Sequence, residues 1–190
     1  CQRQVEIKGP DAARLVQWMT PRNLRQAKIG QCLYITLIDQ NAGMINDPIL
    51  LKLGEDHFWL SIADSDVLLW AKGLSLGSGF DVTVDEPDVS PLAVQGTKAE
   101  ILMEKVFGSC VRNIDFFQFD TVDFNGNPLY VSRSGYSRQG GFEIYLDKSS
   151  LGLDLWDTLW EAGLEFNVAP GYPNLIERVE GGLLSYGNEM

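Results

Sequence analysis

Glu143 has the clearest potential for recognising a ligand, because of where the local pattern places it. Apolar residues at 142, 144 and 146 alternate with Glu143 and Tyr145, which predicts a β-strand over 141–146. The preceding stretch, 134–141, contains three glycines, which permit a tight turn. A carboxylate there, close in sequence to Tyr136 and Tyr145, would accept hydrogen bonds from the amino and ring N–H groups of a planar heterocycle. An ordinary hairpin with a solvent-facing glutamate is the alternative that the local pattern leaves open.

Asp47 is a second candidate, because it interrupts an otherwise apolar predicted strand, 44–53. A buried or half-buried aspartate at such a place must be hydrogen-bonded or functional. The alternative is a turn aspartate that caps backbone N–H groups before Pro48.

Aromatic and charged pairs give weaker signals. The stretch 116–119 contains three phenylalanines, of which two are expected in the core and one on the opposite face, where it would stack on a ligand ring. Trp156 and Trp160 lie four apart on a predicted helix and are expected to pack. Arg178 and Glu180 are expected to form a simple surface ion pair.

Composition excludes several classes of function. The sequence contains no phosphate loop, dinucleotide fingerprint or nucleophile elbow, which argues against ATP, NAD and triad hydrolysis. One histidine, His57, leaves little room for histidine catalysis, and the three cysteines are too widely spaced for a metal site or a disulfide framework. A formal net charge of −11 opposes a nucleic-acid surface. Since no apolar run is long enough to cross a bilayer and no signal peptide is visible, we expect a cytoplasmic protein without a membrane partner.

A repeat organises the elements that carry these residues. Val5–Ala12 and Leu92–Ala99 each read as a strand, a glycine turn and the start of a helix. The chain is therefore expected to be α+β, with two ferredoxin-like split β-α-β repeats, each an antiparallel sheet with helices on one face. Proline and acidic residues at 85–88 suggest domains at 1–87 and 88–190. The other expected elements are strands 31–38, 44–53, 57–63 and 80–85 with helix 65–76, then strands 117–124, 128–134, 141–146 and 166–168 with helix 149–162.

Four stretches, in this order, resemble motifs of the folate-binding aminomethyltransferase family, which includes the T-protein of glycine cleavage. They are VEIKGPDA (5–12), GMIND (43–47), SGYSRQGGFEI (134–144) and RVEGGLLSYG (178–187). Further stretches look more like the dimethylsulfoniopropionate demethylase branch of that family: MTPRN (19–23), SIADSD (61–66), EPDVSPLAVQG (86–96) and PNLIERVEGGLLSYGNEM (173–190).

Two departures from the T-protein pattern argue against aminomethyl chemistry on a lipoyl group. Asn46 and Asp47 stand where that enzyme has a pair of aspartates, and Asn174 stands where an arginine is expected. The family fold would place folate in a central hole formed by the two repeats and a third, C-terminal barrel domain. That third domain and an N-terminal segment are absent from this sequence, so we interpret the sequence as a fragment.

The resemblance implies roles for the candidate residues. Glu143 would hold the pterin ring of tetrahydrofolate, with Tyr136 beside it. Other residues would line the same pocket, namely Ser61, Phe117 and Tyr145. Asp47 would lie near the folate nitrogen that receives the carbon unit, and Tyr34 would face a sulfonium substrate by cation–π attraction.

The implied function is demethylation of dimethylsulfoniopropionate to methylmercaptopropionate, with formation of 5-methyltetrahydrofolate. A glycine-cleavage type of aminomethyltransferase and a folate-binding module without turnover are the alternatives. The expected partner is a small sulfonium molecule, with no metal and no nucleic acid, and a homodimer is left open.

Overall fold

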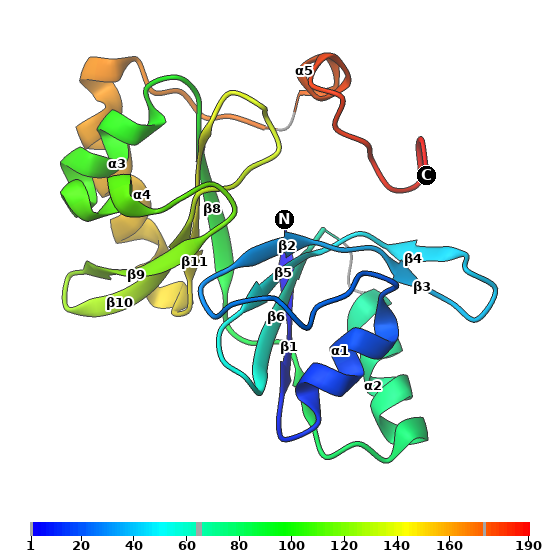
Figure 1. Cartoon of the computed structure of the whole chain (residues 1–190). Coiled ribbons are helices and arrows are strands. Elements are labelled where there is room, and N and C mark those ends of the chain that lie inside the picture. Colours follow the sequence, from blue (N-terminus) through cyan, green and yellow to red (C-terminus); the bar gives the residue numbers. More distant parts are fainter. Residues whose placement is uncertain (1, 64–65, 173) are drawn as a thin grey trace. The chain divides into compact units, whose positions relative to one another are not determined.

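The computed structural model describes residues 2–63, 66–172 and 174–190. The chain divides into two compact units, Cys1–Asp88 (unit 1) and Val89–Met190 (unit 2). Each unit has its own antiparallel sheet and helices (Figure 1). Each also has its own hydrophobic core. The predicted α+β class is therefore confirmed.

Unit 1 is built on an antiparallel sheet in the order β2-β5-β6-β1-β7, and β3 and β4 form a separate two-stranded sheet. Its strands are β1 (Arg3–Lys8), β2 (Cys32–Tyr34), β3 (Leu37–Ile38), β4 (Met44–Asn46), β5 (Ile49–Lys52), β6 (His57–Ile62) and β7 (Thr83–Asp85). Its helices are α1 (Ala12–Met19) and α2 (Asp66–Ser78).

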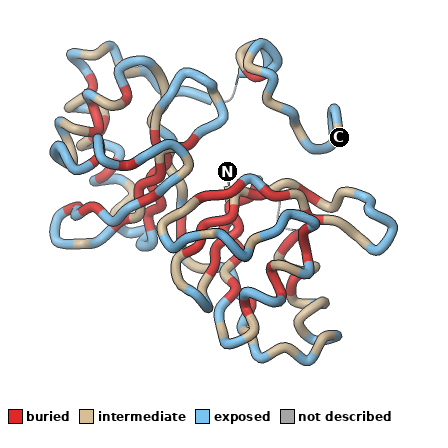
Figure 2. The backbone as a smooth tube through the Cα atoms, viewed as in Figure 1, coloured by how far each residue is buried: buried red, intermediate tan, exposed pale blue. Residues whose placement is uncertain are grey.

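Alternation along the strands decides which face of this sheet the helices cover. Val5 and Ile7 of β1 are buried in one cluster with Leu15 and Met19 of α1, and α2 packs into the same cluster. The residues between them on β1, such as Gln4, therefore lie on the opposite, helix-free face. Figure 2 shows that the buried stretches follow the strands of the sheet and the inner sides of the helices.

Unit 2 follows the same plan, with an antiparallel sheet in the order β8-β11-β10-β9. Its strands are β8 (Ser90–Gln95), β9 (Phe119–Phe124), β10 (Asn127–Ser132) and β11 (Gly141–Leu146). Its helices are α3 (Ala99–Phe107), α4 (Gly152–Gly163) and α5 (Leu175–Glu180), with 3-10 turns η1 (Ser109–Asn113), η2 (Ser149–Leu151) and η3 (Leu164–Phe166). Phe142 and Ile144 of β11 are buried in one cluster with Met103 of α3 and Leu155 of α4.

The turn between the first strand and the first helix is the same in both units. Gly9 (φ +133°) and Gly96 (φ +123°) both have positive φ angles, which glycine adopts far more readily than other residues. The N–H of Ala12 donates to the Gly9 carbonyl (2.9 Å), and that of Ala99 to the Gly96 carbonyl (3.0 Å). This shared geometry agrees with the repeat that the sequence predicts.

Several expected strands are shorter than the sequence suggests. The expected strand 44–53 breaks into β4 and β5 at Asp47 and Pro48, because proline has no N–H to donate to a ladder. The expected strand 31–38 likewise breaks into β2 and β3. Helix α2 begins at Asp66, and the expected start of this helix at Ser65 lies outside the described residues.

The expected strand 166–168 is wrong. The chain there forms η3 and then a left-handed residue, Asn167 (φ 60°), which lets the Val168 N–H donate to the Gly163 carbonyl at the end of α4 (3.1 Å). These contacts end the helix, so no residue of the stretch is extended into a sheet.

The expectation for the phenylalanines at 116–119 is also wrong in part. Phe119 is buried, but Phe116 is 76% exposed and Phe117 is half-buried with a positive φ of 59°. This left-handed residue interrupts the alternation, so β9 begins only at Phe119.

The two tryptophans of α4 pack on each other. The rings of Trp156 and Trp160 are stacked, with an interplanar angle of 8° and a centroid distance of 6.3 Å, and Trp156 is 43% exposed.

Within the described ranges, the helices are too short or too polar to cross a membrane.

Candidate functional site

Strand register brings two candidate residues of unit 1 to one face of its sheet. Ser61 of β6 pairs with Ile49 of β5, and Ile49 pairs with Tyr34 of β2. On the other side, Ser61 pairs with Gln4 of β1. Directly paired residues share a face of an antiparallel sheet, so these four form one cross-strand row on the helix-free face. We call it the unit 1 row.

Asp47 lies at the end of this row, in contact with Tyr34. The Tyr34 hydroxyl donates to Oδ2 of Asp47 at 2.9 Å. The neighbouring Asn46 is buried, and its Oδ1 accepts the backbone N–H of Asp47 at 2.9 Å. The break at Pro48 releases this segment from the strand, so that the Asp47 carboxylate reaches the tyrosine. The structure thus joins two candidates that lie 13 residues apart.

Glu143 occupies the helix-free face of the sheet in unit 2. It pairs with Ala93 of β8 and with Ser132 of β10, and Ser132 pairs with Phe119 of β9. Tyr145, two residues further along β11, has the same orientation. The candidates of unit 2 therefore share a helix-free face, as those of unit 1 do.

The Glu143 side chain is buried and held by hydroxyl groups. It is 8% exposed, and the Ser134 hydroxyl donates a short hydrogen bond to its Oε2. The hydroxyl groups of Ser132 and Ser134 are also hydrogen-bonded to each other. The solvent-facing glutamate that the local pattern leaves open is therefore wrong. Sequence reasoning missed both serines, although their i, i+2 spacing at the end of a predicted strand places them on one face.

Burial raises the pKa of Glu143 above its ordinary value, while hydrogen bonds from Ser134 and Tyr145 act in the opposite direction. A carboxylate offers about four lone-pair sites, so acceptor capacity remains beyond these two donors. The N–H groups of a bound pterin would fit that capacity and would favour the ionised carboxylate. The residues present therefore fit a folate-type ring.

The raised pKa predicts how stability depends on pH. The folded state binds the Glu143 proton more tightly than the unfolded state, so wild-type stability is lost as pH rises from about 4.5 through the raised pKa. Glu143→Gln removes this loss. We expect the gain in Tm of Glu143→Gln over wild type to be larger at pH 8 than at pH 4, measured by thermal unfolding of the full-length protein. An equal gain in Tm at pH 4 and pH 8 would contradict the raised pKa of Glu143.

Gln95 fixes the glycine turn to the start of β11. Its Nε2 donates to the carbonyls of Ser134 (3.0 Å) and Phe142 (3.1 Å), and its Oε1 accepts from the Ser137 hydroxyl (2.7 Å). Gly135 has a φ angle of +153°, which residues with a side chain rarely adopt, so this turn position favours glycine. The turn therefore holds Ser134 where it donates to Glu143.

Tyr136 leaves this turn toward the C-terminal segment. It is 37% exposed, and its hydroxyl donates to the Leu184 carbonyl at 2.7 Å. Three residues further on, Gln139 Nε2 donates to Oε1 of Glu177 in α5 at 3.0 Å. The turn is thus linked within unit 2 to α5 through Glu177 and to the segment after α5 through Leu184.

Arg178 holds the segment that Tyr136 contacts. Both terminal nitrogens of its guanidinium donate to the Glu189 carboxylate at 2.9 Å, and Nη1 also donates to the Leu183 carbonyl (3.2 Å). Arg178 is 6% exposed. The pairing with Arg178 lowers the pKa of Glu189. The expected surface pair of Arg178 with Glu180 is therefore wrong in both partner and exposure.

The ion pair between Arg178 and Glu189 is expected to stabilise the segment around Ser185. The Glu189 carboxylate also accepts the backbone N–H of Ser185 at 2.8 Å. In the full-length protein we expect Glu189→Ala to speed hydrogen exchange at the Ser185 amide about tenfold, since its acceptor is lost. The matched control is Glu180→Ala, which should leave that rate within twofold. Equal effects of both variants would show that the Glu189 contact does not hold the segment.

Phe117 lies beside the residues that position Glu143. Its N–H donates to the carbonyl of Arg133 (3.0 Å), the residue before Ser134. Its ring packs against Phe116 with a centroid distance of 4.8 Å. It precedes β9 and so lies at the end of the sheet near the glycine turn, outside the row that contains Glu143.

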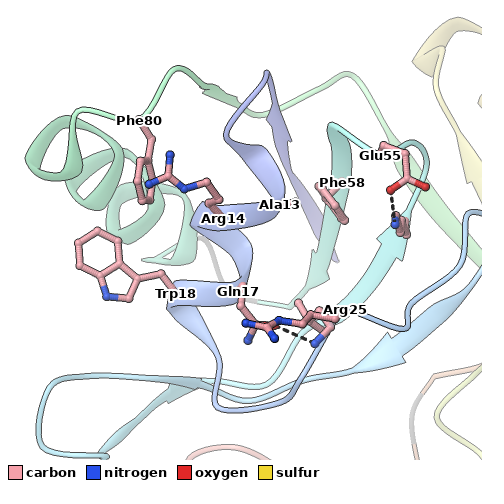
Figure 3. Close-up of a pocket in the computed structure, with 10 residues that line it drawn as sticks. Ala13, Arg14, Gln17, Trp18, Arg25, Glu55, Phe58 and Phe80 are labelled. Atoms are coloured by element: carbon pink, nitrogen blue, oxygen red, sulfur yellow. Dashed lines mark hydrogen bonds and ion pairs between the residues drawn. The ribbon is translucent and has the colours of Figure 1, made fainter.

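A pocket of about 540 Å³ lies in unit 1 beside α1 (Figure 3). Arg14 lies over the Phe80 ring there (4.5 Å to the centroid) and pairs with Asp11, while Lys52 pairs with Glu55. None of the candidate residues lines this pocket, and we assign it no ligand. In the part of the chain that the structure describes, no group of three or more His, Cys, Asp or Glu residues could hold a metal ion.

Comparisons with known proteins give the family. Residues 1–190 match the family described as the GCVT N-terminal domain. The chain is 53% identical over 190 residues to the dimethylsulfoniopropionate demethylase DmdA of Ruegeria pomeroyi, covering 100% of this chain and 52% of that protein. It is 31% identical over 193 residues to an aminomethyltransferase of a Thermoanaerobacter species, covering 98% of this chain and 52% of the relative.

A solved structure agrees with this result. The glycine cleavage system aminomethyltransferase T of Bartonella henselae superposes with a TM-score of 0.74 at 25% identity, over 83% of this chain and 43% of that one. The chain spans about half the length of the curated relatives it matches (52%). Because the match extends over all 190 residues, the chain belongs to the GCVT N-terminal domain family, to which its aminomethyltransferase-like motifs also point.

Proposed function

We propose that the full-length protein transfers a methyl group from dimethylsulfoniopropionate to tetrahydrofolate, forming methylmercaptopropionate and 5-methyltetrahydrofolate. The observation that carries this proposal is the 53% identity, over the whole chain, to a dimethylsulfoniopropionate demethylase. The buried Glu143 carboxylate supports the folate part of the proposal, because it offers acceptors to ring N–H groups inside a desolvated site.

Glu143 would hold the pterin through its amino and ring N–H groups. Ser134 fixes the orientation of the carboxylate by donating to Oε2, and Tyr145, on the same face of β11, would line the same pocket. Tyr136 and Phe117 would line the edge of the ring, at the glycine turn and before β9. Ser61, in unit 1, would also contribute to the folate pocket.

Methyl transfer from a sulfonium needs alignment and desolvation more than a strong acid, because the substrate carries its own leaving group. When bound, tetrahydrofolate would supply the N5 amine that accepts the methyl group, and the electrons of the broken S–C bond would remain on sulfur as a thioether. Asp47 would orient this amine and take up or steer its proton. Tyr34 donates to Asp47 and would present its ring to the sulfonium charge.

Two other functions remain as alternatives, of which one has support from a relative. An aminomethyltransferase is supported by the 31% identity to such enzymes, but the buried Asn46 stands in place of one of two aspartates, and Asn174 in place of an arginine. A folate-binding module without turnover would use the same Glu143 site and no catalytic aspartate.

We also propose that the reaction takes place in the cytoplasm with small molecules as partners. The net charge of −11 disfavours nucleic acid. Cys32 and Cys110 are free thiols in the structure, which suits a reducing compartment.

A comparison of donors tests the proposed function. The full-length protein is incubated with tetrahydrofolate and either dimethylsulfoniopropionate or dimethylglycine, and the folate products are separated. We expect 5-methyltetrahydrofolate with the sulfonium donor only. One-carbon transfer from the amine alone would select the aminomethyltransferase type, and folate binding without either product would select the module without turnover.

A further inference from the structure

Gln4 is a buried amide that lacks hydrogen-bond partners. It is 1% exposed, and within the described part of unit 1 neither its Nε2 nor its Oε1 has a hydrogen-bond partner. A buried donor and acceptor without partners destabilise the folded state, and buried polar groups in native proteins are nearly always paired. The position therefore requires an explanation.

The neighbours of Gln4 on the helix-free face do have partners. Ser61, which is directly opposite in the unit 1 row, donates to Oε1 of Gln2 at 3.0 Å. Glu6, the next residue of β1 on this face, accepts from Trp59 Nε1 at 3.0 Å and is paired with His57 at 2.7 Å. Gln4 thus differs from Ser61 and Glu6, its neighbours on this face.

Other glutamines of the chain show that the fold can satisfy such an amide. In unit 1, Gln17 Nε2 donates to the carbonyls of Thr20 (3.3 Å) and Arg22 (2.9 Å), and its Oε1 accepts the Leu24 N–H (2.8 Å). Gln95 in unit 2 is bonded through both polar atoms in the same manner. The unpaired amide of Gln4 is therefore a local feature of the unit 1 row.

We infer that Gln4 is a ligand-binding residue, whose Nε2 and Oε1 hydrogen-bond an acceptor and a donor on a bound molecule. The inference rests on the proposed function, because the row also contains Ser61 and Tyr34, which that function assigns to folate and substrate. Tetrahydrofolate fits the requirement, since donors and acceptors lie close together along the edge of its pterin ring. An amide is suited to such an edge because it offers both kinds of group in one plane.

The test compares wild type with Gln4→Met and Gln17→Met in the full-length protein. Gln4→Met keeps the side-chain length but removes both unpaired polar atoms, so we expect a higher Tm without ligand and a Kd for tetrahydrofolate raised at least tenfold. Gln17→Met removes satisfied bonds, so we expect a lower Tm and a Kd within twofold of wild type. Thermal unfolding and calorimetric titration under anaerobic conditions give the two quantities.

The outcomes separate this inference from the proposed function. If wild type binds tetrahydrofolate and Gln4→Met binds equally well, the inference is overturned and the proposed function stands. If wild type does not bind tetrahydrofolate, both are overturned. Should Gln4→Met fail to fold, Gln4→Leu replaces it, with the same expected loss of affinity and the same result that would overturn the inference.

Discussion

Glu143→Ala is expected to raise the Kd of the full-length protein for tetrahydrofolate about a hundredfold. The carboxylate is 8% exposed and is oriented by Ser134, so its bonds to ring N–H groups would form away from competing water. A hydrogen bond to a charged group contributes roughly 1.5–3 kcal/mol, so the loss of two such bonds weakens binding by about 3 kcal/mol or more. Calorimetric titration at neutral pH measures the change.

Glu161→Ala is the matched control for this variant. Glu161 is an exposed glutamate of α4 in the same unit, and its removal should leave the Kd within twofold. Glu143→Gln should also bind weakly, because its NH₂ group would face the N–H donors of the ring. Wild-type affinity in Glu143→Ala would show that this carboxylate does not bind the pterin.

Asp47→Asn is expected to lower kcat for methyl transfer about a hundredfold while the Kd for tetrahydrofolate changes less than threefold. An asparagine keeps the size of the side chain and accepts the Tyr34 hydroxyl, but it cannot take up a proton. Positioned acid–base groups typically contribute 10²- to 10⁴-fold, roughly, to rate. Steady-state kinetics with varied sulfonium and folate concentrations separate kcat from KM.

Variants of Tyr34 test the cation–π role separately, and a variant of Asp56 is the control for Asp47→Asn. Tyr34→Ala removes the ring and should raise the KM for the sulfonium roughly two- to thirtyfold, the range of a cation–π contact. Tyr34→Phe keeps the ring and should leave that KM nearly unchanged. Asp56→Asn alters an exposed aspartate of unit 1 and should leave kcat unchanged. An unchanged kcat in Asp47→Asn would remove the proton-handling role, and an unchanged KM in Tyr34→Ala would remove the cation–π role.

The sequence predicted the fold where local periodicity decides the structure. Alternation at 141–146 placed Glu143 in β11, whose bounds agree with the prediction, and the glycines of the two repeat starts marked the same turn in both units. These features depend on neighbouring residues only, so one sequence is enough to read them.

The sequence could not predict contacts between distant residues. Arg178 pairs with Glu189 rather than with its neighbour Glu180, and Gln95 joins two carbonyls that lie 39 and 47 residues away. The positive φ of Phe117 turned the phenylalanine stretch away from the expected alternation. Such outcomes follow from tertiary packing, and the unpaired amide of Gln4 had no signal in the local pattern at all.

Transfer of an isotopically labelled methyl group tests the central claim most directly. The full-length protein is incubated with tetrahydrofolate and dimethylsulfoniopropionate that carries ¹³C in its S-methyl groups, and the folate product is observed by NMR. The proposed function predicts the label on N5 of tetrahydrofolate in equal amount to the methylmercaptopropionate formed. Loss of the sulfonium without label on the folate, or no reaction while folate binds, would contradict it.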